Sequence, residues 1–489
     1  MKPEPHRTAP DSLDPEDWQE LRSQGHRMFD DMIDYLSGLR TRPVWQPIPD
    51  AIRSGFQAEL PRGPGSLEQA HQRFMQEILP YGVGNSHPGF MGWVQGGGNA
   101  VGMLAEMLAA GLNANLGGRN QIPVDVEWQV VQWVREMLGF SEEASGLFVT
   151  GTSMANLIAL WVARVAMLGT AVRKEGLAAG GSKLVAYTSA GAHGCITQAM
   201  DLAGLGTAAL RVIPMNAAFE IDMALLEEAI AKDRAAGLQP FFIAATAGSV
   251  DVGAIDPLSA IADLAVREQI WFHVDGAFGA LGMLAPDIAP RLSGIERANS
   301  VALDFHKWGQ VPYDAGFIMV RDGALHQATF SSPVSYLRRE TRGLAGGSPW
   351  PCDFGPDLSR GFRALKAWFT LQVYGADKLG QVISHTCALA QYMKQRIEAA
   401  TQLELLAPVS LNIVCFRHRG RPGMDAGKLD RFNADLAVAI QESGKAAPST
   451  TIVNGRLAIR AAIVNHRTSR AEVDALIDTA LTLATTIAA

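Results

Sequence analysis

The stretch that decides the fold is Asp304-Phe305-His306-Lys307-Trp308, which follows the short apolar run Val301 to Leu303. It pairs naturally with His273-Val274-Asp275-Gly276-Ala277, which also ends a short apolar run. Short apolar runs that alternate with helical patterns are typical of parallel strands buried on both faces. Because the carboxyl ends of parallel strands meet at one edge of a sheet, we expect Asp275 and Lys307 to lie on neighbouring strand ends.

A lysine and an aspartate in that arrangement suit one kind of chemistry. A lysine amine forms a Schiff base with an aldehyde, and a carboxylate keeps a pyridine nitrogen protonated so that the ring can withdraw electrons. Both groups are what pyridoxal 5′-phosphate (PLP) requires. The apolar setting of Lys307 indicates burial, which we expect to lower its pKa. The alternatives are an ordinary surface lysine and, for Asp275, a helix cap.

Composition limits the possible classes of protein. The chain has 489 residues, 48% of them hydrophobic, which suits two to four domains or one large α/β domain with attachments. The net charge of −7 leaves no basic footprint for nucleic acid. The four cysteines lack metal-ligand spacing and are expected to be free thiols in a reducing compartment. They are Cys195, Cys352, Cys387 and Cys415.

The N-terminal stretch and the most apolar segment both favour a cytoplasmic protein. Met1 to Asp11 has no apolar core and does not resemble a signal peptide. The apolar stretch Ala100 to Leu116 is interrupted by Glu106 and Asn113, which argues against a membrane span. We therefore expect a soluble protein without nucleic-acid or membrane partners and without a metal site.

The periodicity divides the chain into three parts. Residues 1–85 are predicted to form an N-terminal helical arm, with helices from Asp14 to Leu39 and from Ser66 to Ile78. This arm carries too little apolar surface for an independent domain, so we expect it to pack on a second subunit rather than form a free tail. Residues 86–375 and 376–489 are predicted to be a large domain and a small α+β domain.

The large domain is predicted to be α/β, with a mostly parallel sheet covered by helices on both faces. Its predicted strands are Leu184 to Thr188, Phe241 to Ala247, Ile270 to Val274, Ser300 to Leu303 and Gly316 to Val320. Ligands of such sheets bind beyond the carboxyl ends of the strands.

Two further motifs lie where this sheet would place a ligand. Gly151-Thr152-Ser153 opens an apolar helix, and such a loop offers backbone N–H groups and hydroxyls to an anion. A simple N-cap is the alternative. His193 follows a predicted strand, where it is either an imidazole stacked on a cofactor ring or a satisfied histidine at a helix start.

In their combined order these motifs resemble the group II PLP-dependent amino-acid decarboxylases of fold type I. That family includes aromatic-L-amino-acid, histidine and glutamate decarboxylases. The resemblance extends from the first helix to the last and implies a homodimer with active sites at the interface. It is carried by His87-Pro88, Gly151-Thr152-Ser153, His193, residues 240–248, residues 273–277, residues 305–308 and residues 361–374.

The resemblance also implies a role for each matching residue. Lys307 would hold PLP as a Schiff base, and Asp275 would pair with the pyridine nitrogen. Ala277 and His193 would pack on opposite faces of the ring. The reaction implied is decarboxylation of an L-amino acid to its amine through a Schiff base between substrate and cofactor, with Lys307, His193 and Asp275 catalytic. The remaining cofactor-binding positions are Thr152, Ser153 and His306 for the phosphate and Thr246 for the ring pocket.

Two residues are candidates for the substrate pocket. Trp93 occupies a position that lines the pocket of the aromatic enzymes, within a glycine-rich stretch that could equally be a plain turn. Arg119 would reach across the dimer and could bind a substrate carboxylate. A structural ion pair with Asp125 or Glu127 is an equally good interpretation. The pattern selects no particular amino acid as substrate.

The sequence departs from the family in the loop from Ser331 to Asp353. The aromatic decarboxylases present a proton-donating tyrosine there, but the matching position falls near Pro349 or Trp350, and Tyr336 matches a different one. Loss of that donor is associated in the family with oxidative aldehyde formation. A PLP-dependent aldehyde synthase is therefore the first alternative, and Cys352, or His193 acting through water, could serve as the acid.

A fold-type I aminotransferase is a less favoured alternative. Its arginine clamp for the substrate carboxylate is not recognisable, although Arg460 could supply one. A catalytically dead scaffold is disfavoured by the intact set of lysine, aspartate and histidine. Asp304 is also unusual, because a carboxylate close to the predicted phosphate site is unfavourable unless it is paired.

Overall fold

The large sheet of the computed structural model has seven strands, six of which run in the same direction. The structure describes residues 12–179, 183–332 and 338–487. The strand order is β2-β8-β7-β6-β5-β3-β4, and only β8 is antiparallel to its neighbours. The predicted mostly parallel sheet is confirmed. The strands are β2 (Ser145–Val149), β3 (Leu184–Ser189), β4 (Leu210–Ile213), β5 (Gln239–Thr246), β6 (Trp271–Asp275), β7 (Ser300–Asp304) and β8 (Gly316–Val320).

The five strands predicted from apolar runs all form, each within two residues of its predicted bounds. The two edge strands, β2 and β4, are not among these predictions. β4 pairs only with β3, and Arg211 and Val212 in its middle are not buried, so its sequence lacks a continuous apolar run. A strand that is buried on both faces gives a clearer apolar signal than a partly exposed strand such as β4.

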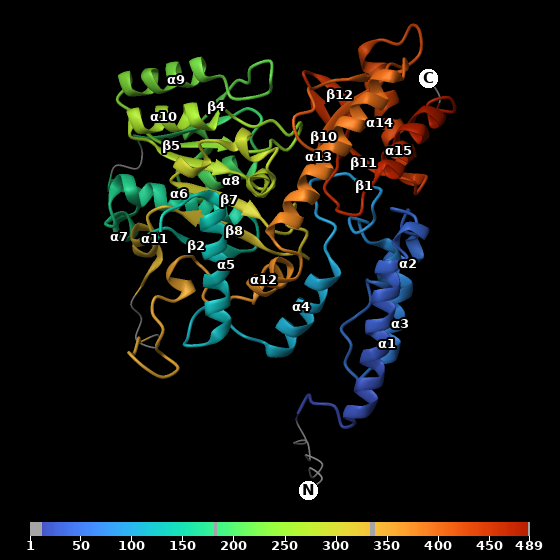
Figure 1. Ribbon diagram of the computed structural model, residues 1–489, viewed down its shortest axis with the longest axis horizontal. Helices are drawn as coiled ribbons and strands as arrows, with labels where there is room; N and C mark the ends of the chain where they lie inside the picture. The colour runs from blue at the N-terminus through green and yellow to red at the C-terminus, as the bar shows by residue number, and fades with distance from the viewer. Residues whose placement is uncertain (1–11, 180–182, 333–337, 488–489) are drawn as a thin grey trace.

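Helices cover both faces of this sheet (Figure 1). Alternate residues of one strand serve opposite faces, as Ile243 and Phe242 of β5 do: each belongs to a different hydrophobic core cluster. The first cluster includes residues of α5, α9, α10 and α12, and the second includes residues of α6 and α8. The helices around the sheet are α4 (Ala100–Leu112), α5 (Ile122–Leu138), α6 (Thr152–Leu168), α7 (Val172–Glu175), α8 (Cys195–Leu202), α9 (Met223–Ala235), α10 (Leu258–Glu268), α11 (Gly323–Phe330) and α12 (Arg363–Tyr374).

The C-terminal part forms a second sheet with its own core, in the order β1-β11-β12-β10-β9. β1 comes from the chain before the large sheet, yet it pairs in parallel with β11. The strands are β1 (Phe90–Met91), β9 (Leu403–Leu405), β10 (Ile413–His418), β11 (Ala447–Val453) and β12 (Arg456–Ala462). The helices beside them are α13 (Ala376–Ala399), α14 (Ala426–Glu442) and α15 (Arg470–Leu483). The predicted α+β character is confirmed, and the division at residues 85 and 375 stays a prediction.

The N-terminal helices stand apart from the large sheet (Figure 1). They are α1 (Trp18–Ser37), α2 (Asp50–Gly55) and α3 (Leu67–Arg73). His71 of α3 joins α1 through Gln24 (3.1 Å) and Asp31 (3.2 Å). Trp18 and Phe29 of α1 are 59% and 40% exposed, so part of the apolar surface of this helix is uncovered in this chain.

Within the described ranges, no single helix has the length and apolar character needed to cross a membrane; one sharply bent pair, Thr152–Leu168 with Val172–Ala178, meets those criteria by length and composition only.

A buried ion pair ties α5 to the strand that leads into the Gly151 loop. Arg360 donates to Glu127 at 2.5 Å, and both side chains are almost fully buried. Arg360 also donates to the carbonyls of Leu116 (2.8 Å) and Phe148 (2.7 Å), and Glu127 accepts from the Phe148 N–H (3.2 Å). Since Glu127, Leu116 and Phe148 lie on different segments, this pair joins three segments at one buried point.

Replacing Glu127 with alanine should therefore destabilise the fold. The change leaves the Arg360 charge buried without its partner, which costs about 3–5 kcal/mol. The matched control is Asp263→Ala, which breaks the exposed pair with Arg297 and should change stability by less than about 1 kcal/mol. Urea unfolding followed by circular dichroism measures both, and equal effects of the two variants would contradict the role given to the buried pair.

Candidate active site

A pocket of about 430 Å³ opens at the carboxyl ends of the parallel strands. Thr246 ends β5, Asp275 ends β6, and these two residues are paired in register. Lys307 follows β7, the next strand of the sheet. The prediction that strand ends bring these side chains together is confirmed. All eight residues predicted to bind the cofactor line this pocket: Thr152, Ser153, His193, Thr246, Asp275, Ala277, His306 and Lys307.

Asp275 is buried at one end of the pocket inside a hydrogen-bond network. Its carboxylate accepts from Asn156 Nδ2 (3.0 Å) and from the Ala277 N–H (3.2 Å). Asn156 Oδ1 lies 2.7 Å from Nε2 of His273, whose Nδ1 lies 2.9 Å from Ser300 Oγ. Burial raises the pKa of Asp275, against the opposing influence of Lys307 and these hydrogen bonds. The arrangement leaves a buried acid that a cationic ring nitrogen would complement.

Lys307 makes an ion pair that the sequence did not predict. Its Nζ lies 2.9 Å from Oδ2 of Asp304, the last residue of β7. Burial lowers the pKa of Lys307, but the adjacent Asp304 and the more distant Asp275 outweigh burial and raise it above the ordinary value. The predicted lowering is therefore wrong for this state of the protein, because Asp304 is paired with the amine rather than pointing away.

The opposite end of the pocket is built for an anion. The first N–H of α6, on Thr152, points to Asp304 Oδ1 at 2.8 Å. The hydroxyls of Thr152 and Thr246 are buried and have no hydrogen-bond partner in the described part of the chain. Gly316 lies so close to Gly151 that a Cβ would sit 2.3 Å from its Cα, which holds the loop against β8. The unpaired Thr152 hydroxyl at the N-terminus of α6 fits a phosphate ester, whereas Thr246 ends β5 next to Asp275.

The fit to PLP is therefore good at three points of the pocket. Lys307 supplies the amine, Asp275 faces the place of a pyridine nitrogen, and Thr152 belongs to an anion-binding helix terminus. His306 is held by the Ala315 N–H, which donates to its Nδ1 at 3.0 Å. Burial lowers the pKa of His306, with partial compensation from Asp304.

The remaining predicted residues border the entrance. His193 is exposed in this chain, and its Nδ1 accepts from the Cys195 N–H at 3.2 Å. Trp93 also lines the pocket and is 56% exposed, so its stretch is a pocket wall and not only a turn. Each residue occupies a position suited to its predicted role, and the roles themselves stay predictions.

Sequence reasoning missed three residues of the site. Asn156 and Cys195 both contact Asp275, with the Cys195 sulfur 3.8 Å from its carboxylate. Burial and the Asp275 charge raise the pKa of Cys195 to about 12, so it is a thiol and not a nucleophile. Tyr313 lines the pocket with its ring centroid 4.3 Å from that of His306. Its place after Pro312, nine residues from the end of β7, was the only available signal.

Arg119 does not line this pocket within its own chain. Its guanidinium lies over the indole of Trp350, 4.6 Å from the ring centroid. The alternative ion pair with Asp125 or Glu127 is wrong: among the described residues Arg119 makes no ion pair within 4.0 Å, and Glu127 pairs with Arg360. The prediction that Arg119 reaches across a dimer stays a prediction.

Trp350 is one of the two residues near the position where the family resemblance places the proton donor, and it is fully buried. Its Nε1 donates to the Gly346 carbonyl at 2.8 Å, and the guanidinium of Arg339 also lies over the ring, 3.4 Å from its centroid. The indole therefore cannot deliver a proton to the pocket within this chain. Cys352 does not line the pocket either, and Tyr336 lies outside the described residues.

Arg460, the candidate clamp of an aminotransferase, has its donors committed elsewhere. Nη1 donates to the Gly92 carbonyl (2.7 Å), Nε to the Asp251 carbonyl (3.2 Å) and Nη2 to the Val250 carbonyl. The buried guanidinium of Arg460 therefore has a structural role, since it links three backbone carbonyls. It does not offer a free fork to a substrate carboxylate.

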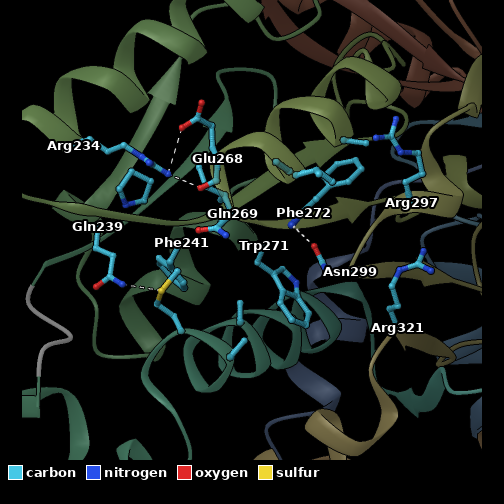
Figure 2. A pocket seen from close by; sticks show the side chains of 18 of the residues that line it. Arg234, Gln239, Phe241, Glu268, Gln269, Trp271, Phe272, Arg297, Asn299 and Arg321 are labelled. Carbon is cyan, nitrogen blue, oxygen red and sulfur yellow. Dashed lines mark hydrogen bonds and ion pairs between the residues drawn. The ribbon is translucent and has the colours of Figure 1, made fainter.

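A larger pocket, of about 840 Å³, lies at the opposite ends of the strands, where β5 and β6 begin (Figure 2). It contains none of the predicted site residues. Its three arginines already have partners: Arg234 at Glu268, Arg297 at Asp263, and Arg321 at the carbonyls of Glu296 and Ala298. We therefore place the active site in the smaller pocket, at the carboxyl ends of the parallel strands.

The fold and the pocket together define an α/β enzyme that uses PLP. Comparison with known proteins agrees: residues 49–419 match the family model of the pyridoxal-dependent decarboxylase conserved domain. An aromatic-L-amino-acid decarboxylase of Bacillus atrophaeus is 31% identical over 93% of each chain.

Solved structures give the same result. Oryza sativa TDC with PLP and tryptamine aligns over 97% of this chain and 99% of its own, with 25% identity and a TM-score of 0.88. Rhodiola rosea 4-hydroxyphenylacetaldehyde synthase covers 97% and 100%, with 25% identity and a TM-score of 0.85. The chain belongs to the pyridoxal-dependent decarboxylase family. It is a PLP-dependent amino-acid decarboxylase of fold type I.

The buried network around Asp275 should make the enzyme sensitive to acid. Burial lowers the pKa of His273 to about 3, whereas the unfolded value is 6.5. A depressed folded pKa contributes stability that is complete above pH 6.5 and is lost as the pH falls toward 3, because the unfolded chain binds the proton. His273→Gln should reduce this slope by about 1.4 kcal/mol per pH unit within that window.

Urea unfolding of the cofactor-free enzyme at a series of pH values measures the slope. His26→Gln is the matched control, since His26 is exposed and lies outside the network. An unchanged slope in His273→Gln would show that another group accounts for the loss of stability in acid.

Proposed function

We propose that the substrate is an aromatic L-amino acid. The wall of the pocket next to Lys307 carries Trp93, Val94, Phe278 and Tyr313, which offer aromatic and apolar surface. Lys307 is the single lysine or arginine among the described lining residues, and Asp304 already pairs with it. An acidic substrate side chain would find no free cation there. The names of the decarboxylases similar to this chain support the same class.

The proposed mechanism divides the work among the residues of the pocket. Bound PLP supplies an electron sink for the carbon that loses carbon dioxide. Asp275 holds a proton at the pyridine nitrogen, supported by Asn156. Thr152 and Ser153 bind the phosphate with their hydroxyls and N–H groups. Thr246 and Ala277 hold the ring in the slot, and His306 orients the phosphate end.

His193 is the proposed cover and acid of the site. It stands at the entrance, where an imidazole can exclude water from the reacting bonds. Of the two acids considered for returning a proton to the α-carbon, His193 lines the pocket and Cys352 does not. We therefore assign that proton transfer to His193, directly or through one water molecule.

We propose further that the enzyme is a cytoplasmic homodimer without nucleic-acid or membrane partners. The exposed Trp18 and Phe29 of α1 would be covered by a second copy of the chain. In such a dimer we propose that Arg119 of the partner copy approaches the pocket and Trp93. The net charge of −7 supports the proposal that the enzyme does not bind nucleic acid.

A second candidate is an aldehyde synthase, which couples decarboxylation to oxidative deamination. One observation favours it: the donor position is expected near Pro349 or Trp350, and Trp350 is buried with two guanidinium groups over its ring. The likeness of this fold to that of the Rhodiola rosea 4-hydroxyphenylacetaldehyde synthase supports this candidate.

The enzyme should release carbon dioxide and the amine from tryptophan, tyrosine or phenylalanine, and much less from glutamate or aspartate. Headspace carbon dioxide, amine, peroxide and ammonia are measured together for all five. Peroxide with ammonia would select the aldehyde synthase. Faster turnover of an acidic amino acid would refute the aromatic assignment and point to Arg119 of the partner copy.

Lys307→Ala should lose turnover and the visible absorption of bound cofactor while the protein stays folded. The loss should exceed roughly a thousandfold, since covalent attachment and proton handling at this amine disappear together. Borohydride reduction followed by peptide mapping should place the label on Lys307. A label on another lysine would overturn the assignment. Lys366→Met is a control, since Lys366 pairs with Glu106 outside the pocket.

A further inference from the structure

Asp304 occupies the place where the cofactor pocket should bind a phosphate. Its side chain is only 3% exposed, and Oδ1 accepts the first N–H of α6, from Thr152, at 2.8 Å. The N-terminus of a 17-residue helix stabilises an anion, and here the anion is part of the protein. The hydroxyl of Thr152, at the same helix N-terminus, is buried and has no hydrogen-bond partner among the described residues.

The other oxygen of Asp304 holds the reactive amine. Oδ2 lies 2.9 Å from Lys307 Nζ and 3.6 Å from His306 Nε2. One carboxylate therefore contacts a residue at the phosphate end and the lysine that must become free to react. Lys307 has the second acid, Asp275, as a more distant neighbour, but only Asp304 is within ion-pair distance.

We propose that Asp304 is an internal competitor for the phosphate of PLP: it fills the α6 N-terminus and holds the Lys307 ammonium, so that cofactor loading requires it to release both contacts. This inference rests on the proposed roles of Thr152 and Lys307. It assigns Asp304 to a control of cofactor affinity and not to the reaction itself.

The consequence is a cofactor affinity below what the rest of the pocket would give. A phosphate dianion that reaches Thr152 meets the Asp304 carboxylate, which hydrogen-bonds to Thr152 and is also negatively charged. Two negative charges that share one site disfavour each other. Removing the charge should favour any ligand that carries a phosphate. It should also leave Lys307 without its closest counter-charge, which makes the neutral amine easier to form.

The test compares Asp304→Asn with the wild-type apoenzyme, prepared by removing PLP from the holoenzyme. Calorimetric titration with inorganic phosphate, and absorbance titration with PLP, should both show tighter binding in the variant, by roughly tenfold or more. Pyridoxal, which lacks the phosphate, should gain less than PLP. The difference between these two ligands separates competition at Thr152 from release of Lys307.

Asp314→Asn is the matched control. Asp314 follows the pocket residue Tyr313, but its carboxylate pairs with Arg363 at 2.7 Å and contacts neither Thr152 nor Lys307. Phosphate and PLP binding should be unchanged in this variant. Equal tightening in both variants would overturn the proposal, because a general change of charge would then explain it.

Unchanged or weaker binding in Asp304→Asn would also overturn it, since Asp304 would then help to hold the cofactor. Asp304→Ser provides a second variant if the amide disturbs folding, and thermal unfolding of both apoenzymes identifies that case. Failure of the proposed function looks different: the wild-type protein would bind no PLP, and borohydride would label no lysine at position 307.

Discussion

The register of three parallel strands is the constraint on which the site depends. Thr246 and Asp275 face each other across β5 and β6, and Asp275 faces Ala302 of β7. The side chains of a strand alternate between faces, so a shift of one residue would turn an acid away from the pocket and expose core residues. The hydrophobic pattern of both faces fixes this register, since Ile243 and Phe242 are buried in different clusters. Catalytic geometry is thus secured by the core.

Electrostatics then decides what the buried groups can do. Two carboxylates and one amine share the bottom of the pocket, and they are not equivalent. Asp275 is held by neutral donors, Asn156 and the Ala277 N–H, whereas Asp304 is held by a helix terminus and an ammonium. Distinct surroundings separate the behaviour of groups that are chemically identical. The pocket is asymmetric before any ligand enters, because Asp304 is in ion-pair contact with Lys307 and Asp275 lies farther from it.

The sequence was informative where the local pattern and the tertiary role coincide. Apolar runs located the strands, and the polar residues just after them located the pocket, so that all eight cofactor positions fall together. It was uninformative where a partner is distant along the chain. Asp304 meets Thr152 across 152 positions, and Arg119 meets Trp350 through a loop of irregular structure. No periodicity encodes such contacts. The pKa of Lys307 was predicted in the wrong direction for another reason: Asp304 is only three residues away, but the sequence does not tell whether its carboxylate pairs with the amine or points away from it.

The pairing of β1 with β11 has a consequence for the pocket wall. Gly92, next to Trp93, offers its carbonyl to Arg460 (2.7 Å) and to Ser449 Oγ (2.6 Å), both on strands of the C-terminal sheet. The lysine and the acids are rooted in the large sheet. One wall of the cavity is therefore attached to the large sheet, and the wall beside Trp93 is attached to the C-terminal sheet. Any hinge motion between the halves would widen or narrow the gap that a substrate has to fill.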